Sequence, residues 1–320
     1  MKSILTGLFW LTAAASAASA SDVAPASGPV DIQAYDHGRT GLTVSVNDGL
    51  AVNYRVFALS VMPGEMLTLS ADRAVDWRSE RPFAEIPGEG AVWLAPDQPG
   101  HHVIEAVGAS GETIRLNVFV LRPASEIRNG SLSGYRIGDY PSEPYRGLDT
   151  YRAPEGYIEV SQDMLEIEVA PHFTLGQFLC KQEAGWPRYA VVREGLLLSL
   201  EDILERVNAN GWRTDGFVVM SGYRTPDYNQ DLRNGENSRH VYGGAADIFI
   251  DEDGDKVMDD LNGDGVQNQE DAAVLFDFIH TLMEDESTGL AGGLGEYRAN
   301  GFHGPYVHID ERGFNVRWGR

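Results

Sequence analysis

The sequence predicts two folded domains: an all-β immunoglobulin-like sandwich over residues 39–124, then an α+β domain over residues 125–320 that combines an antiparallel sheet with helices. The 320 residues exceed the roughly 150 that are typical of one domain. The 36 glycines and 15 prolines favour short strands joined by turns over a helical bundle. The hydrophobic share of 42% and the charged share of 23% are those of a globular protein, which excludes disorder and fibrous repeats.

The excess of acidic over basic residues limits the classes of molecule that we expect the protein to bind. Lysine and arginine together number 25 against 48 aspartates and glutamates, which gives a formal net charge of −23. This charge repels phosphate backbones and anionic lipids at long range. We therefore expect no nucleic-acid partner.

The first 20 residues have the layout of a secretory signal peptide. Lys2 precedes an apolar stretch over 4–15, and the small residues 18–20 provide a cleavage site. Small and polar residues follow over 21–38, which we expect to form a flexible lead. No later run reaches the roughly 20 apolar residues of a membrane span. We therefore expect a periplasmic or secreted protein with no membrane span.

Residues 39–124 alternate between apolar and polar positions, as strands with one buried face do. Turn-forming pairs such as Pro63-Gly64 and Pro99-Gly100 separate the predicted strands. This spacing is typical of an antiparallel sandwich of immunoglobulin type, although Cys180 is the only cysteine and the cysteine pair of that fold is absent. The predicted strands cover residues 42–46, 54–61, 66–70, 91–94, 102–107 and 113–120. No residue here indicates catalysis, so we expect a domain that presents the second one.

The second domain begins after Arg122-Pro123, which break the strand pattern. A leucine-rich stripe over 196–207 predicts a helix that ends at Asn210-Gly211, and another apolar stripe predicts a helix over 271–284. The predicted buried strands cover residues 217–220 and 246–250. Because helices and strands mix without a regular repeat, the predicted class is α+β.

His240, Asp247 and His308 are candidate metal ligands. Gly243-Gly244 argues against a continuous helix, so we expect a loop histidine that leads into a strand carrying the aspartate. Asp247 has apolar neighbours, and a buried carboxylate needs a partner such as a metal. Two imidazoles and one carboxylate leave zinc an open position for water, which is the arrangement of a catalytic site and implies hydrolysis. The alternative is two hydrogen-bonded core histidines and a capping aspartate.

Three motifs resemble the zinc D,D-peptidases of bacterial cell-wall metabolism, a superfamily of D-Ala-D-Ala carboxypeptidases, D,D-dipeptidases and murein endopeptidases. They are Ser221-Gly222-Tyr223-Arg224, Ser238-x-His240-x-x-Gly243-x-Ala245-x-Asp247, and the closing His308. The C-terminal segment, with Val307-His308-Ile309-Asp310 and Trp318, looks most like the murein endopeptidase K branch. The resemblance extends from about residue 196 to the C-terminus.

This resemblance implies a zinc-peptidase fold for the second domain, with His240, Asp247 and His308 as the zinc ligands. It places Arg224 against a substrate carboxylate or the developing oxyanion, for which a planar, permanently charged guanidinium is suited. The implied substrates are peptidoglycan stem peptides or their cross-links. Because the superfamily holds both carboxypeptidases and endopeptidases, the bond that is cleaved stays open.

The general base is the point at which the sequence departs from its relatives. Many of them carry a Glu three residues, or a His two residues, before the last ligand, where this chain has Pro305 and Tyr306. Asp310 lies two residues after His308, on the same face of a strand, and is our first candidate to take the proton from water. His303 is the second. A third possibility is that Asp310 binds the metal and His308 assists.

An acidic insertion over 251–271 resembles a calcium loop. Oxygen-bearing side chains recur with EF-hand spacing, and Gly265 stands at the sixth position of the loop. The predicted calcium ligands are Asp260, Asn262, Asp264, Val266, Asn268 and Asp271. A possible second, less regular calcium site comprises Asp251, Asp253, Asp255 and Asp259. We expect structural calcium, because so many neighbouring carboxylates repel one another without a cation; the alternative is a solvated acidic loop.

Together these features predict a zinc metallopeptidase with structural calcium, either a D,D-carboxypeptidase or a murein endopeptidase, that acts on peptidoglycan. The alternative is a catalytically silent cell-wall binding module that retains the zinc fold, which the departure before His308 favours. A calcium-stabilised adhesin is a third possibility, but it does not explain why Arg224, His240 and His308 occur together.

Overall fold

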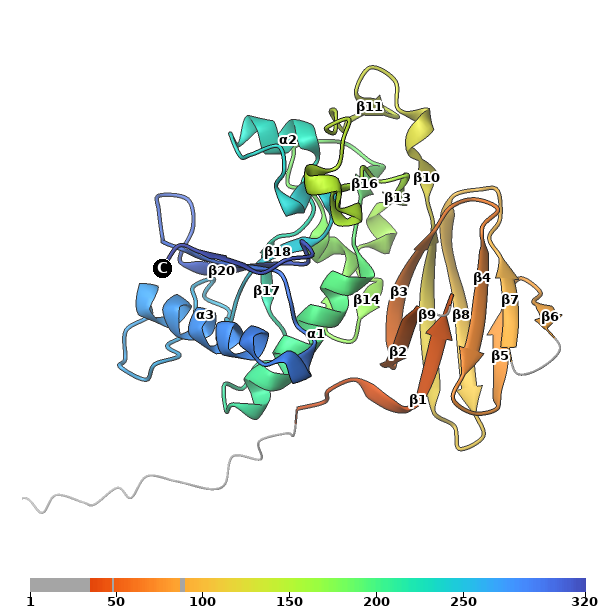
Figure 1. Ribbon diagram of the computed structural model, residues 1–320, viewed down its shortest axis with the longest axis horizontal. Coiled ribbons are helices and arrows are strands. Elements are labelled where there is room, and N and C mark those ends of the chain that lie inside the picture. The colour runs from red at the N-terminus through yellow and green to blue at the C-terminus, as the bar shows by residue number, and fades with distance from the viewer. Residues whose placement is uncertain (1–34, 48, 87–89) are drawn as a thin grey trace, which may run out of the picture. The chain divides into compact units, whose positions relative to one another are not determined.

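The computed structural model describes residues 35–47, 49–86 and 90–320, and residues 35–320 form one compact unit. The structure is a mixture of α and β, rich in sheet and with few helices (Figure 1). Within the described ranges no helix has the length and apolar character needed to cross a membrane. The predicted signal peptide and residues 21–34 of the predicted lead lie outside the described residues.

The all-β segment is built from two sheets. The first is antiparallel, in the order β2-β1-β4-β7-β6, and comprises β1 (Arg39–Val46), β2 (Leu50–Tyr54), β4 (Met66–Ala71), β6 (Ala84–Ile86) and β7 (Gly90–Leu94). The second has the order β3-β9-β8-β5 and comprises β3 (Val56–Val61), β5 (Val75–Ser79), β8 (Gly100–Gly108) and β9 (Thr113–Val120). In this sheet β3 runs parallel to β9, whereas the other pairs are antiparallel.

One strand predicted from the sequence begins too early. The apolar alternation over 54–61 predicts a single strand, which corresponds to β3 from Val56 onward, whereas Tyr54 is the last residue of β2 in the other sheet. Ile114, Leu116 and Val118 of β9 are fully buried, as their shared face predicts. The immunoglobulin class of this segment remains a prediction.

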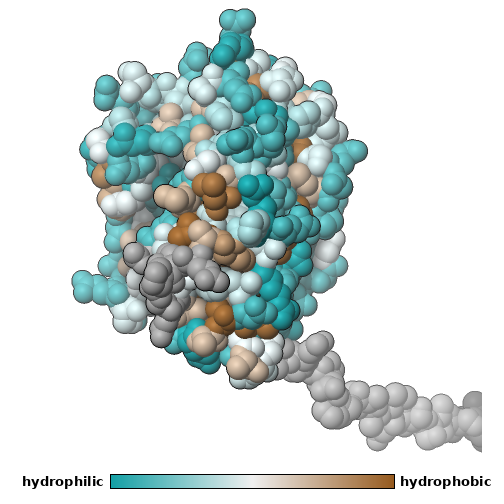
Figure 2. All heavy atoms as spheres, turned by 90° about the vertical axis from the view of Figure 1, so that its right-hand side faces the viewer, coloured by the Kyte–Doolittle hydropathy of each residue, from teal (hydrophilic) through white to brown (hydrophobic). Residues whose placement is uncertain are grey.

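The first sheet also exposes apolar side chains. Met66 of β4 and Leu94 of β7 pair across the two strands and are 64% and 51% exposed. Figure 2 looks onto the side of the molecule where β6 and β7 lie in Figure 1, and apolar residues gather there among polar ones. These side chains do not belong to the metal site described below.

Short elements join the two sheets to the second domain. They form a three-stranded sheet, β10-β13-β16, and the hairpins β11-β12 and β14-β15. Their bounds are β10 (Arg122–Pro123), β11 (Ser131–Leu132), β12 (Tyr135–Arg136), β13 (Gly156–Val160), β14 (Glu168–Ala170), β15 (Phe173–Thr174) and β16 (Arg188–Ala190). The 3₁₀ helices here are η1 (Ala124–Glu126), η2 (Tyr145–Gly147), η3 (Asp149–Tyr151), η4 (Gln162–Met164) and η5 (Leu175–Phe178).

A five-stranded sheet forms the centre of the C-terminal part of this unit, the part predicted as a second domain, in the order β17-β18-β20-β19-β21. Its strands are β17 (Val218–Ser221), β18 (Ala245–Phe249), β19 (Gly293–Tyr297), β20 (Tyr306–Asp310) and β21 (Val316–Trp318). All pairs are antiparallel except β19 with β21. In the pair β18–β20, Asp247 lies directly opposite His308. This register brings two of the three predicted metal ligands together.

Three α-helices accompany this sheet: α1 (Glu194–Ala209), α2 (Pro226–Asp231) and α3 (Gln269–Glu284); the remaining 3₁₀ helices are η6 (Arg239–Tyr242) and η7 (Glu286–Thr288). The leucine stripe predicted over 196–207 is the buried face of α1, which ends at Ala209 with Asn210 as its C-cap. Helix α3 begins with a capping box in which the side chains of Asn268 and Asp271 accept backbone N–H groups.

Candidate metal centre

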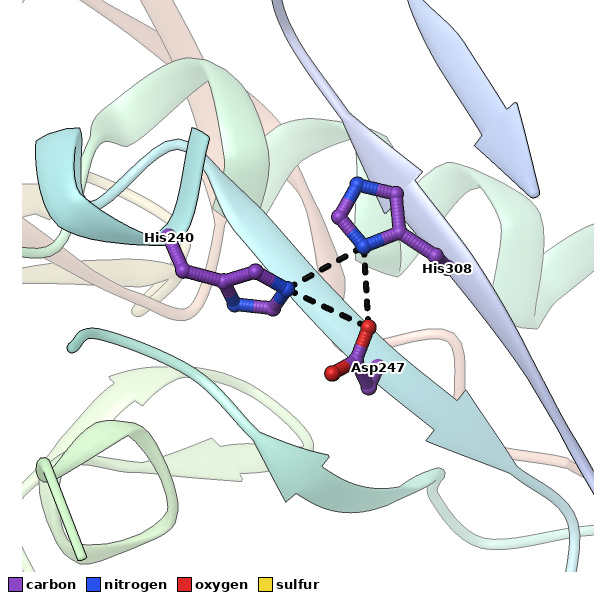
Figure 3. Close-up of side chains that lie close together, drawn as sticks. All are labelled: His240, Asp247 and His308. Atoms are coloured by element: carbon purple, nitrogen blue, oxygen red, sulfur yellow. Dashed lines mark hydrogen bonds and ion pairs between the residues drawn. The ribbon is translucent and has the colours of Figure 1, made fainter. Parts of the chain in front are cut away.

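His240, Asp247 and His308 converge on one point, with one ligand atom from each within hydrogen-bond distance of the other two (Figure 3). His240 Nε2 lies 3.2 Å from Asp247 Oδ1 and 3.1 Å from His308 Nδ1, and the last two atoms are 2.8 Å apart. The three side chains come from η6, β18 and β20, and all are buried. The first two lie in one local turn, and strand pairing brings the third from 61 residues further along the chain.

Local backbone chemistry explains the turn between the first two ligands. Gly243 ends η6 in the left-handed region, at φ 68°, where a residue with a side chain is strained. A Cβ at this position would also collide with the carbonyl of Val191. The glycine therefore lets the chain reverse from η6 into β18, so that His240 and Asp247 face each other.

The hydrogen bonds of the outer nitrogens, those that point away from the other two ligands, determine which atoms of the two imidazoles carry protons. His240 Nδ1 lies 2.7 Å from the carbonyl oxygen of Gly222, and His308 Nε2 lies 2.9 Å from Asp310 Oδ2. Both oxygens can only accept, because the carboxylate of Asp310 is ionised, so both outer nitrogens donate. The inner nitrogens of the neutral rings, His240 Nε2 and His308 Nδ1, then carry lone pairs, which face each other and the carboxylate of Asp247.

Three acceptors this close repel one another unless a cation lies between them. Burial lowers the pKa of His240, with Asp247 opposing, which keeps this imidazole neutral. Burial would raise the pKa of Asp247, but the two histidines hold it well below its usual range. Burial also disfavours a protonated His308, yet hydrogen bonds to Asp247 and Asp310 outweigh it and raise the pKa of this imidazole. A proton on His308 or a metal ion supplies the missing positive charge.

The donor set fits zinc. Two imidazole nitrogens and one carboxylate oxygen are preferred ligands of Zn²⁺, and three protein ligands leave a fourth position for water. The hydrogen bonds from the outer nitrogens to Gly222 and Asp310 are those that hold metal-binding imidazoles in the required tautomer.

Arg224 binds the far oxygen of the same aspartate. Its Nη2 lies 2.5 Å from Asp247 Oδ2, and its Nε donates to Ser221 Oγ at 2.8 Å. The side chain is only 13% exposed. The guanidinium therefore fixes Asp247 with Oδ1 toward the histidines, and it also lines the cavity in which the site lies.

Asp310 lies behind His308, on the side of the ring away from Asp247. Its carboxylate accepts from His308 Nε2, from the backbone N–H groups of Gly293 and Arg312, and from the guanidinium of Arg312. Burial opposes ionisation, but Arg312 and His308 hold the pKa of this carboxyl below its usual range. Both oxygens are fully engaged, and the residue is not part of the cavity lining.

A cavity of about 820 Å³ opens onto the three candidate ligands. His303, the second candidate base, lines it; its Nδ1 lies 2.7 Å from the carbonyl oxygen of Gly304 and its Nε2 lies 2.7 Å from Asn300 Nδ2. Glu236 supplies a further carboxylate, which the sequence does not indicate because nothing in its loop resembles a catalytic motif.

Aromatic rings form one wall of this cavity, and the sequence does not indicate their role either. Tyr297 and Tyr306 stack with ring centroids 4.8 Å apart, and Trp318 lies 5.2 Å from the ring of His308. A Cβ on Gly295 would collide with the indole of Trp318. The spacing of Tyr297 and Tyr306 in the sequence carries no sign of this wall, because it depends on the pairing of β19, β20 and β21.

The carboxylates of the acidic insertion over 251–271 are arranged differently from those of the metal centre. Asp251, Asp253 and Asp259 converge closely enough to hold a cation. In the loop that begins at Asp260, carboxylates accept backbone N–H groups of the loop itself, and Asp271 is fully buried at the start of α3. Calcium therefore remains a prediction for both loops.

The comparisons with known proteins bear on the second domain. Residues 171–281 match a family model described as Peptidase M15. Neither the curated proteins nor the solved structures that were compared with the chain gave a match. The matched part includes Arg224, His240 and Asp247, whereas His308 lies beyond it. The match covers less than half of the chain, and together with the His–Asp–His group it supports a metallopeptidase domain of the zinc-dependent M15 type in this region.

Proposed function

We propose that the protein is a zinc peptidase that hydrolyses peptidoglycan stem peptides or the cross-links between them. The observation that carries this proposal is the triad of facing ligand atoms, His240 Nε2, Asp247 Oδ1 and His308 Nδ1, which a metal ion can join and which opens onto a large cavity. The similarity of residues 171–281 to Peptidase M15 supports a peptidase. The cell-wall substrate rests on the motif resemblance.

Each residue of the centre has a part in the proposed reaction. His240, Asp247 and His308 would hold the zinc ion, which when bound polarises the scissile carbonyl and acidifies a water molecule. Arg224 holds the carboxylate of Asp247 in place, and its position in the cavity lining lets it attract a substrate carboxylate. The carbonyl of Gly222 orients the ring of His240 in the same way that Asp310 orients that of His308.

We assign the proton acceptor to His303 and a positioning role to Asp310. A base must reach the reacting water and have a free lone pair. The contacts of the Asp310 carboxylate argue against a role as the base, because both of its oxygens already accept from Arg312 or His308. His303 lines the cavity, and its Nε2 becomes available once the amide of Asn300 turns away. Glu236 is the competing group, and substitution distinguishes the two.

The remaining parts of the chain support this function indirectly. We propose that the all-β segment is the immunoglobulin-like sandwich predicted from its strand spacing, that it presents the peptidase domain outside the cytoplasm, and that calcium stabilises the insertion over 251–271. Adding Ca²⁺ to zinc-loaded protein that has been dialysed free of calcium should then raise its melting temperature. An unchanged melting temperature would contradict the calcium assignment without affecting the peptidase.

Incubation of the zinc-loaded protein with isolated sacculi, followed by mass analysis of the released muropeptides, tests the proposal. We expect products whose masses identify the cleaved bond, and we expect a chelator of zinc to abolish them. His308→Ala serves as the inactive control. Absence of any product from protein with verified zinc would refute hydrolysis and favour a silent cell-wall binding module, the alternative supported by the lack of a Glu or His just before His308.

A further inference from the structure

A second cavity of about 500 Å³ adjoins the one at the metal centre. The two share Met220, Phe302 and His303 in their linings, so they lie side by side, and the two together are called the groove. Phe302 is fully exposed at this junction. The metal centre therefore lies in one part of the groove, and the second cavity provides a place for a portion of the substrate away from the scissile bond.

The second cavity lies along one edge of the five-stranded sheet. β17 is the strand at this edge, and its consecutive residues Val218, Val219 and Met220 all line the cavity. Consecutive side chains point to opposite faces of a strand, so a cavity lined by all three runs along the strand rather than over one face. Among the described strands, only β18 pairs with β17; the 3₁₀ helix η5 also packs against β17, and its Phe178 accepts the backbone N–H of Tyr223 just beyond the strand. An extended peptide can therefore lie against this edge and use its backbone groups.

The charge in this cavity differs from that of the chain as a whole. Apart from Lys2, the only lysines in the sequence are Lys181 and Lys256, and both line this cavity. Within the described residues neither ammonium pairs with a carboxylate, although the chain has a net charge of −23. Asp251 also lines the cavity, but its oxygens accept the backbone N–H groups of its own loop at 254–256.

The charge of Lys181 also interacts with charged groups at the metal centre. Burial and the guanidinium of Arg224 lower the pKa of its ammonium, whereas Asp247 raises it. Lys181 and Arg224 thus place positive charge along the groove in a protein that otherwise repels acidic molecules.

We propose that this second cavity is a subsite for an acidic residue of the peptide substrate, whose carboxylate binds Lys181 and Lys256 while its backbone extends along β17. The proposal rests on the proposed peptidase function and adds a substrate preference to it. The apolar remainder of the lining suits the aliphatic part of such a residue. A free carboxylate is thereby selected over a carboxamide, because only the carboxylate carries the charge that the two ammonium groups attract.

The test compares two synthetic peptides that are identical except for a carboxylate or a carboxamide on one side chain, with that residue placed in turn on either side of the scissile bond. We expect zinc-loaded protein to cleave the acidic peptide with a kcat/KM about fivefold higher, the value of one partly exposed ion pair, and the difference to lie in KM. Lys181→Gln should remove this preference, and Lys181→Arg should retain most of it. Arg78→Gln, which removes one positive charge from β5, is the matched control and should keep the preference.

Calorimetric binding of both peptides to the zinc-free full chain separates this inference from the proposed function. If neither peptide is cleaved by zinc-loaded protein, the peptidase proposal fails, while preferential binding of the acidic peptide still supports the subsite. Equal cleavage and equal binding of the two peptides would overturn the subsite and leave the peptidase intact. A loss of affinity in Lys181→Gln that is the same for both peptides would also overturn it.

Discussion

Replacement of Asp310 by asparagine distinguishes a positioning residue from a general base. Asp310→Asn keeps the size of the side chain and its ability to accept from His308 Nε2, but it removes the negative charge. Only the charged form can neutralise Arg312 and strengthen the hydrogen bond from the ring of His308. We therefore expect the effect to fall on zinc affinity.

The contacts of Asp310 determine how much zinc affinity and stability the Asp310→Asn variant should lose. Loss of an outer partner of a metal-binding imidazole typically weakens metal binding by about 10- to 100-fold. The side chain of Arg312, only 18% exposed, is left without its charged partner, which costs about 1.5–3 kcal/mol of folding free energy. At saturating zinc, kcat should recover to within about tenfold of the wild-type value, because the proton acceptor is still present. Loss of a general base would instead lower kcat by about 10²- to 10⁴-fold at any zinc concentration.

Two measurements separate these outcomes. Competition with a chelating dye reports zinc affinity, and peptide hydrolysis at increasing zinc reports kcat at saturation. Circular dichroism at the assay temperature controls for unfolding. A variant with wild-type zinc affinity and a kcat reduced by more than 100-fold would show that Asp310 takes the proton and that our reasoning from its hydrogen bonds is wrong.

Three further predictions concern other parts of the site. His303→Gln should lower kcat by about 10²- to 10⁴-fold with zinc affinity unchanged, and Glu236→Gln should leave kcat nearly unchanged; the reverse result would make Glu236 the base. Gly295→Ala should lower the free energy of unfolding by about 1–3 kcal/mol in urea titration, because its Cβ displaces Trp318; an unchanged urea midpoint would show that the indole moves freely. Because Arg312 and His308 hold the pKa of Asp310 low despite burial, its stabilising contribution is complete above about pH 4 and is lost on further acidification. Asp310→Asn should therefore lose less stability than the wild type between pH 5 and pH 3.

The sequence predicts the candidate ligands but not the arrangement behind them. The resemblance of their motifs to those of zinc D,D-peptidases selects His240, Asp247 and His308, because each of these residues alone is a weak signal. The pairing of β18 with β20, which places Asp247 opposite His308, is a long-range contact that no local pattern encodes. The sequence also places Asp310 on the same face as His308, but its role depends on Arg312, whose side chain folds back onto the carboxylate.

Local sequence patterns also predict where a helix or strand lies better than they predict which other element it packs against or pairs with. The leucine stripe over 196–207 predicts α1 because a buried helical face repeats at a fixed interval. The apolar alternation over 54–61 does not reveal that the chain changes sheets at residue 55, since apolar residues occur on both sides of this point. The aromatic wall formed by Tyr297 and Trp318 depends in the same way on the parallel pairing of β19 with β21. These features follow from tertiary contacts and not from the order of residues alone.

Zinc content and coordination of the purified protein test the central claim most directly. Elemental analysis combined with X-ray absorption should find one zinc ion per chain, bound by two imidazole nitrogens and a carboxylate oxygen with water completing the site. His240→Ala and His308→Ala should each abolish stoichiometric binding, while Arg78→Gln should retain it. A wild-type protein that binds no zinc, or a His308→Ala variant that binds it as tightly as the wild type, would contradict the account.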